Sequence, residues 1–309
     1  MAKFLDVNNR TEDHHRLYKD TFRIELGLRA IAIMYDEHSN DKNSYINILK
    51  HKENVEYRLF SATYQYLVFL RELSNAEFYL QEIYKKEDLI NHSFLFSNPY
   101  FDRVEQEISS IFDNIIFQIS SMFDYLSHII SYILFKNKSK SNYWMKLAKM
   151  SRGNNNELQG LDIKTVIDIV DRWFVGRLYD YRSRLLHYNR DKHQFDGLMN
   201  TKNLRFRIKI IPSDLAIKYF QVVNEDALED EKVTLTYLSS WLIKKSFQEI
   251  GYILDALEIE IKKVSCYQDN LSQALFDPNK LDFGAFNSDT RRVDPLSELL
   301  WKNFKSYYK

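Results

Sequence analysis

Apolar residues recur every three or four positions over most of this chain, which places them on one face of an α-helix. The pattern is clearest over residues 54–86, 99–135, 161–173 and 233–264. Residues 99–135 are apolar on so much of the helix surface that we expect this segment at the centre of a bundle. Pro99 suits the first turn of that helix and Asn98 suits its N-cap.

Two segments depart from the helical pattern. Residues 17–36 combine an alternating run with an apolar run, so helix and strand are both open, and the helical segment that follows favours a helix. Residues 204–211 alternate between apolar and polar positions, as a half-exposed strand does, with Arg205, Arg207 and Lys209 on the outer face. With residues 195–199 as its partner, this strand allows one small β-hairpin near residues 194–211.

Composition restricts the class of protein. The 309 residues include 7 Gly and 4 Pro, and such a scarcity of turn residues favours long helices. The 43 basic and 43 acidic residues leave no net charge, so an RNA-binding surface would have to be a local patch. The single cysteine, Cys266, excludes an internal disulfide and favours a reducing, cytoplasmic compartment. No window is apolar enough for a membrane span.

The chain divides into three segments in this interpretation. Residues 1–53 form an N-terminal extension whose first 16 residues are polar and expected to fray. Residues 54–265 form a helical bundle. Residues 266–309 form a tail, broken at Pro278 and Pro295, whose scattered apolar residues are expected to pack on the domain or on a partner.

Residues 179–190 carry the strongest chemical signal, because they combine several arginines with one histidine. Arg182, Ser183 and His187 form an R-x4-H spacing. This resembles the R-x4-6-H motif of the HEPN superfamily, and the resemblance covers roughly residues 55–265. It implies an all-α HEPN-like bundle with long central helices that acts as a metal-independent endoribonuclease in bacterial defence, stress or toxin–antitoxin biology. It also implies a homodimer with a composite site, RNA as substrate and an antitoxin as a further partner.

The residue types suit metal-independent RNA cleavage. The planar guanidinium of Arg182 can bind two oxygens of the scissile phosphate, and His187 can transfer protons near neutral pH. Ser183 would orient the phosphate or the histidine, although asparagine, aspartate or histidine is commoner there in the family. Arg184, three residues before His187, is its closer neighbour on a helix. We expect no metal and no cofactor, since no nucleotide-binding or metal-binding motif is present.

Three further residues are candidates for RNA binding. Tyr181 and Tyr188 flank the motif and could stack on bases, and Arg190 could contact the phosphate backbone. Tyrosine is abundant in this chain, with 21 residues, so two flanking tyrosines are weak evidence for stacking.

A carboxylate on a neighbouring helix completes the predicted site. Asp113 and Asp124 lie within the apolar helix of residues 99–135, where a buried carboxylate needs a partner. The surroundings of Asp124 resemble the helix that packs beside the motif in some HEPN proteins, which implies that Asp124 supports Arg182 or His187. The alternative is an acid that faces solvent.

A second function stays open on the sequence alone. The chain could be a non-catalytic helical module that keeps a HEPN fold for dimerisation or for binding RNA or protein. Ser183 and the absence of net charge favour this alternative. Under this alternative, Leu185 and Leu186 are core residues. His187 then ends a helix, where its charge suits the negative end of the helix dipole.

Overall fold

The computed structural model describes residues 3–39, 41–87, 99–136, 143–187, 191–200, 205–220, 231–263, 285–287, 292–294 and 296–306, and these are mostly helical. The helices of these ranges are α1 (Arg10–His38), α2 (Lys42–Glu87), α4 (Pro99–Phe135), α5 (Trp144–Arg152), α6 (Ile163–Val170), α7 (Gly176–His187), α8 (Asp214–Tyr219), α10 (Leu235–Lys263) and α12 (Leu296–Ser306). The mostly helical fold class is therefore confirmed.

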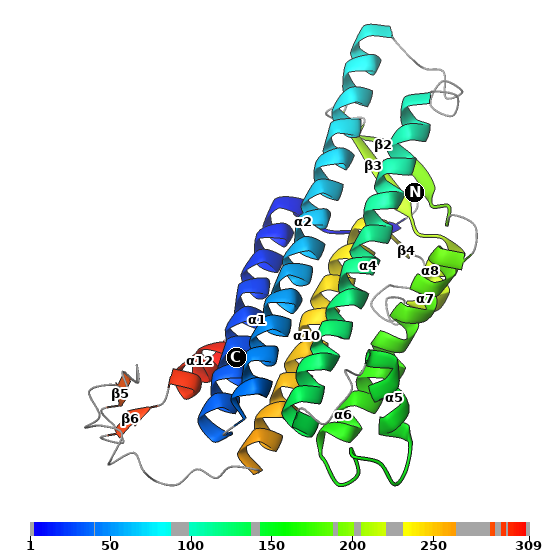
Figure 1. Ribbon diagram of the computed structural model, residues 1–309. Helices are drawn as coiled ribbons and strands as arrows, with labels where there is room; N and C mark the ends of the chain where they lie inside the picture. Colours follow the sequence, from blue (N-terminus) through cyan, green and yellow to red (C-terminus); the bar gives the residue numbers. More distant parts are fainter. Residues whose placement is uncertain are drawn as a thin grey trace. The chain divides into compact units, whose positions relative to one another are not determined.

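Residue contacts divide the chain into two compact units. Unit 1 comprises Met1–Tyr18, Leu59–Ser120 and Phe174–Lys245, and unit 2 comprises Lys19–Arg58, Ser121–Trp173 and Ser246–Lys309. In each unit, segments of the long helices run side by side (Figure 1). The boundary that the sequence pattern places between residues 53 and 54 lies inside α2, and the division into three segments stays a prediction.

The central helix α4 begins and ends where the apolar pattern predicted. Its apolar side chains are buried in both units: Ile108, Phe112, Ile115 and Ile119 in unit 1, and Met122, Phe123, Leu126 and Ile130 in unit 2. The helix α2 begins earlier than predicted, at Lys42, because Asp41 caps it. The Asp41 carboxylate accepts hydrogen bonds from the Ser44 backbone N–H at 3.1 Å and from the Ser44 hydroxyl at 2.7 Å.

The approach to the motif is a continuous run of helical turns. After α6, the chain passes through a π-helical turn, η2 (Asp171–Val175), and α7 begins directly at Gly176. In unit 2, the indole of Trp144 donates a hydrogen bond to the buried carboxylate of Asp171 at 2.8 Å, and Arg152 pairs with the same carboxylate. These contacts fix the start of the π turn.

The predicted hairpin is present in unit 1. Strand β2 (Gln194–Asn200) pairs antiparallel with β3 (Arg205–Ile211), and Gln194 lies opposite Ile211. Ile208 and Ile210 are buried and Arg205 and Arg207 are exposed, as the alternation requires. Two of the three outer basic residues pair with acids inside the chain: Arg207 pairs with Glu77 at 2.9 Å and Lys209 pairs with Asp6.

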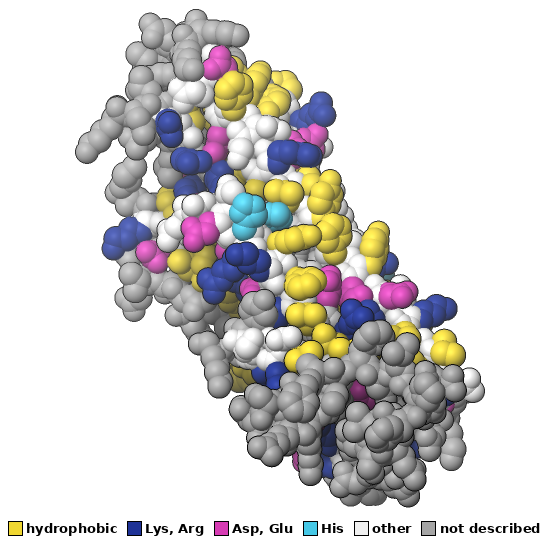
Figure 2. All heavy atoms as spheres, turned by 90° about the vertical axis from the view of Figure 1, so that its left-hand side faces the viewer, with side chains coloured by type: hydrophobic (Ala, Val, Ile, Leu, Met, Phe, Trp, Pro, Cys, Tyr) yellow, Lys and Arg dark blue, Asp and Glu magenta, His cyan; other side chains and the backbone are white. Residues whose placement is uncertain are grey.

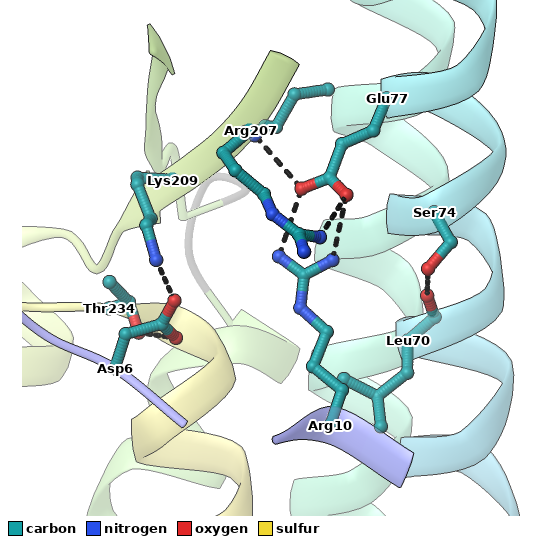
Figure 3. Close-up of polar contacts among 9 residues, drawn as sticks. Asp6, Arg10, Leu70, Ser74, Glu77, Arg207, Lys209 and Thr234 are labelled. Carbon is teal, nitrogen blue, oxygen red and sulfur yellow. Dashed lines mark hydrogen bonds and ion pairs between the residues drawn. The ribbon is translucent and has the colours of Figure 1, made fainter. Parts of the chain in front are cut away.

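Residues 3–5 form a strand and residues 10–16 belong to α1, contrary to the prediction that this polar segment frays. Strand β1 (Lys3–Leu5) pairs in parallel with β4 (Glu231–Val233), and the Thr234 hydroxyl donates to Asp6 at 2.7 Å. Figure 3 shows the neighbouring cluster around Glu77, where the guanidinium of Arg10 donates two hydrogen bonds at 3.0 and 3.1 Å. Polar residues can therefore be ordered here because they pair with one another inside unit 1.

The C-terminal helix packs within unit 2. Phe304 of α12 is fully buried and lies against α1 at Gly27, where a β-carbon would come within 2.9 Å of the phenyl ring. The absent side chain of Gly27 thus allows the two helices to approach closely. For residues 296–306, the predicted tail packs on the chain itself. A two-stranded sheet joins β5 (Ala285–Asn287) to β6 (Arg292–Asp294).

Candidate functional site

The motif helix α7 has one buried face and one exposed face in unit 1. Leu178 and Tyr181 are buried, whereas Asp180, Ser183, Arg184 and His187 are exposed. The exposed residues follow the spacing i, i+3, i+4 and i+7, which forms one stripe along a helix. The last turn of α7 carries the basic residues Arg184 and His187, a residue type that suits the negative end of the helix dipole.

Arg182 lies off this stripe. Its guanidinium carbon is 5.9 Å from the ring centroid of Phe117 on α4 and 5.8 Å from that of Tyr179. The Tyr179 hydroxyl donates to the backbone carbonyl of Ser120 at 3.0 Å, which fixes that ring against α4. Residues five apart are separated by about 140° around a helix. The structure therefore places Arg182 toward α4 and His187 toward solvent.

An open pocket of about 380 Å³ lies between α2 and α4, next to the Arg182 contact. It is lined by Gln65, Ser110, Ile111, Asp113, Asn114 and Phe117. Phe117 belongs both to this pocket and to the ring pair that contacts Arg182. The sequence pattern singles out Asp113 only as an acid that needs a partner, and it does not single out Gln65 or Asn114. Polar residues within an apolar helical segment are the signal that could have found them.

A buried polar cluster follows the motif and explains the position of Tyr181. The Tyr181 hydroxyl donates to the Asp191 carboxylate at 2.7 Å, and the Ser213 hydroxyl donates to the same oxygen at 2.5 Å. Burial first, and then the charge of Asp191, raise the pKa of the Tyr181 phenol. The ring is 0% exposed. A fully buried ring offers no face to a base, so the structure does not support the predicted stacking by Tyr181.

Ser213, His193 and Asp191 lie close together but are not arranged as a hydrolase triad. The Ser213 backbone N–H, not its hydroxyl, donates to His193 Nδ1 at 3.1 Å. The Ser213 hydroxyl accepts from the Ala216 backbone N–H at 3.0 Å as the N-cap of α8. A nucleophile needs its hydroxyl directed at the base. This cluster instead ties the segment after α7 to the start of α8.

The remaining predicted site residues have different outcomes. Arg184 is exposed and donates to the Tyr219 hydroxyl at 3.3 Å, which links α7 to α8. Asp124 belongs to unit 2, whereas the motif belongs to unit 1, so its support for the motif stays a prediction. Tyr188 and Arg190 lie outside the described residues.

Comparison with known proteins gives no assignment. No protein-family model matches this chain, and searches of curated proteins and of solved structures find no significant match. Among the residues that the structure describes, no group of three or more His, Cys, Asp or Glu side chains could hold a metal ion. The described helices also include none that could cross a membrane.

Proposed function

We propose that this chain is a HEPN-like endoribonuclease that cleaves RNA without a metal ion. The observation that carries the proposal is the exposure of Ser183, Arg184 and His187 on one stripe of α7. A proton-transferring imidazole must reach the substrate, and an exposed histidine beside an arginine suits an anionic substrate. The R-x4-H resemblance supplies the class of reaction.

The proposed reaction transfers the scissile phosphate within the RNA strand. The 2′-oxygen loses its proton to an imidazole and forms a bond to phosphorus, while the bond from phosphorus to the 5′-oxygen breaks. The departing 5′-oxygen takes up a proton, which leaves a 2′,3′-cyclic phosphate and a 5′-hydroxyl. Arg182 binds the phosphate oxygens and stabilises the charge that develops there.

A composite site follows from the separation of the two motif residues. Arg182 contacts Phe117 and Tyr179, whereas His187 lies on the exposed stripe, so one α7 does not present both to one phosphate. In the proposal, His187 of one copy and Arg182 of another act together. The cation–π contacts of Arg182 are worth about 0.5–1 kcal/mol at exposed sites, which a bidentate phosphate contact can offset.

The same separation favours a second candidate function. A non-catalytic helical module for RNA or protein binding needs no shared face for Arg182 and His187. It would use the exposed stripe of α7 as a binding surface, and Ser183 would need no catalytic role.

Cleavage of RNA in the presence of EDTA tests the proposal. We expect the native chain to cleave, and both Arg182→Ala and His187→Ala to lower the rate at least about a hundredfold, because each removes a group that acts in the transition state. Arg103→Ala and His15→Ala are matched controls, since both residues are exposed and lie outside α7.

The outcomes separate the two functions. RNA binding without cleavage, weakened by Arg184→Ala, would support the binding module. Cleavage that survives both motif substitutions would place the site elsewhere and contradict the assignment of Arg182 and His187. Products that end in a 2′,3′-cyclic phosphate would identify the proposed chemistry.

A further inference from the structure

The helix α2 carries a row of side chains that are exposed in the structure. Its members alternate in spacing between four and three residues, and they are Ile46, Lys50, Glu53, Tyr57, Phe60, Tyr64, Leu67, Arg71, Ser74 and Phe78. The six apolar members are from 39% exposed, at Leu67, to 68% exposed, at Phe78. The side of the molecule drawn in Figure 2 carries a band of hydrophobic side chains with charged ones beside it.

The opposite face of α2 already supplies the core. Val55, Leu59, Ala62, Phe69 and Leu73 are buried on that side, at 0 or 1% exposure. The exposed row therefore adds a second apolar surface to one uninterrupted helix. Its alternating spacing is that of the seam of a coiled coil, in which each apolar side chain inserts between side chains of a second helix. A contiguous exposed apolar surface of this kind marks an interaction site.

The row is complementary to itself when it is reversed about Ala62. In an antiparallel pair centred there, Phe60 lies opposite Tyr64 of the partner subunit, Tyr57 opposite Leu67 of the partner subunit, and Ile46 opposite Phe78 of the partner subunit. All of these pairs are apolar. Large aromatic side chains such as Tyr and Phe contribute strongly to interfaces because they bury much surface.

The charges of the row match in the same register. Glu53 lies opposite Arg71 of the partner subunit, and the two-fold symmetry creates this pair twice. Lys50 then lies opposite Ser74 of the partner subunit, so no like charges meet within the row. In the single chain, Arg71 contacts only the adjacent Glu72 among the ion pairs described, at 3.2 Å, with 62% of the arginine side chain exposed. Such a surface ion pair is weak, so Arg71 can leave Glu72 and pair with Glu53 of the partner subunit.

We propose that two copies of this chain associate through the α2 row as an antiparallel helix pair, with the two-fold axis beside Ala62. The seam runs about 48 Å along α2, from Ile46 to Phe78, at 1.5 Å per residue. A strict seven-residue repeat drifts by about 20° per heptad on a straight helix, so the pair adopts a slight left-handed supercoil. The inference rests on α2 alone and does not depend on ribonuclease activity or on α7.

The mass of the full chain in solution, measured over a range of concentrations, tests the interface. We expect a dimer for the native chain. Phe60→Glu with Tyr64→Glu should give a monomer with unchanged helical circular dichroism, because both residues lie next to the axis and are exposed in the single chain. A native chain that stays monomeric at the highest concentration would overturn the proposal, and so would a dimer that persists in the double variant.

A charge exchange tests the register. Glu53→Arg and Arg71→Glu should each raise the dissociation constant roughly tenfold, because each creates two repulsive pairs per dimer. Combining them in one chain should restore the native value, since the opposite charges meet again. Arg103→Glu is the matched control, because Arg103 is an exposed arginine paired on its own helix, with Glu107 at 2.8 Å. A double variant as weak as the single ones would overturn the antiparallel register.

Disulfide formation gives a second test of the register in a Cys266→Ser background. Mixing Glu53→Cys chains with Arg71→Cys chains should give a cross-linked heterodimer, whereas Glu53→Cys alone should not cross-link. A disulfide between two Glu53→Cys chains would indicate a parallel pair and overturn the proposal. None of these measurements involves RNA, so their failure is distinguishable from failure of the cleavage experiment.

Discussion

At the scale of single residues, Glu77 shows how one buried carboxylate can join three parts of unit 1. It lies on α2 and is 7% exposed. It accepts hydrogen bonds from Arg10 of α1, from Arg207 of β3 and, at 3.0 Å, from the Ile208 backbone N–H (Figure 3). A buried charge is tolerated because its donors replace the lost hydration.

Glu77→Gln should therefore destabilise the protein. The neutral amide leaves two arginines without their counter-charge, and we expect the free energy of unfolding to fall by about 2–4 kcal/mol in urea denaturation. Glu107→Gln is the matched control, because Glu107 is 41% exposed and its ion pair with Arg103 is solvated. That variant should change stability by less than about 1 kcal/mol. Equal effects of the two substitutions would contradict the role given to Glu77.

At the scale of elements, α12 is held to unit 2 by a small number of anchors. Trp301 is 7% exposed and Phe304 is fully buried. The guanidinium carbon of Arg23 on α1 lies 5.8 Å from the centroid of the Phe304 ring, and Lys305 pairs with Asp255 on α10. A helix of 11 residues is marginal by itself in water, so α12 depends on this packing.

Phe304→Ala should release α12. Removing a buried phenyl ring costs about 3–5 kcal/mol, a large loss for a helix that is marginal by itself. We expect proteases to cleave within residues 296–306 at least about tenfold faster while the rest of the chain stays intact. Phe22→Ala is the control, because Phe22 of α1 is 56% exposed. Unchanged cleavage of the Phe304 variant would show that other contacts hold the helix.

At the scale of the whole molecule, the chain has no net charge at pH 7, so its pH dependence reflects individual groups. In unit 2, His51 of α2 and His128 of α4 lie 4.7 Å apart between ring centroids, surrounded by Tyr125 and Tyr132. Burial first, and then the proximity of His128, lower the pKa of His51 from its ordinary value of 6.5 to about 4. Burial also lowers the pKa of His128, which the nearby charge of Asp124 partly opposes.

These histidines should make the protein less stable in mild acid. Between pH 6.5 and about 4 the unfolded chain binds more protons at His51 than the folded chain does, so the free energy of unfolding falls as the pH falls through this window. His51→Phe should reduce that slope in urea denaturation. An equal slope for native and His51→Phe chains would contradict this assignment.

The sequence by itself determined the helical class, the full length of α4 and the hairpin of residues 194–211. Each of these features follows from the pattern of apolar and polar residues over a short stretch of sequence. The exposed row of α2 is also visible as a heptad spacing, but only the fold decided that this face is left uncovered.

Tertiary structure decided which polar residues meet. Glu77 and Arg207 are 130 positions apart, and Asp6 and Thr234 are 228 apart, so local patterns carry no signal for these pairs. The same reason explains the order of the N-terminal residues, the burial of Tyr181 and the pocket beside Phe117. A hydrogen bond between distant residues depends on how packed helices bring them together, and that is a property of the whole fold.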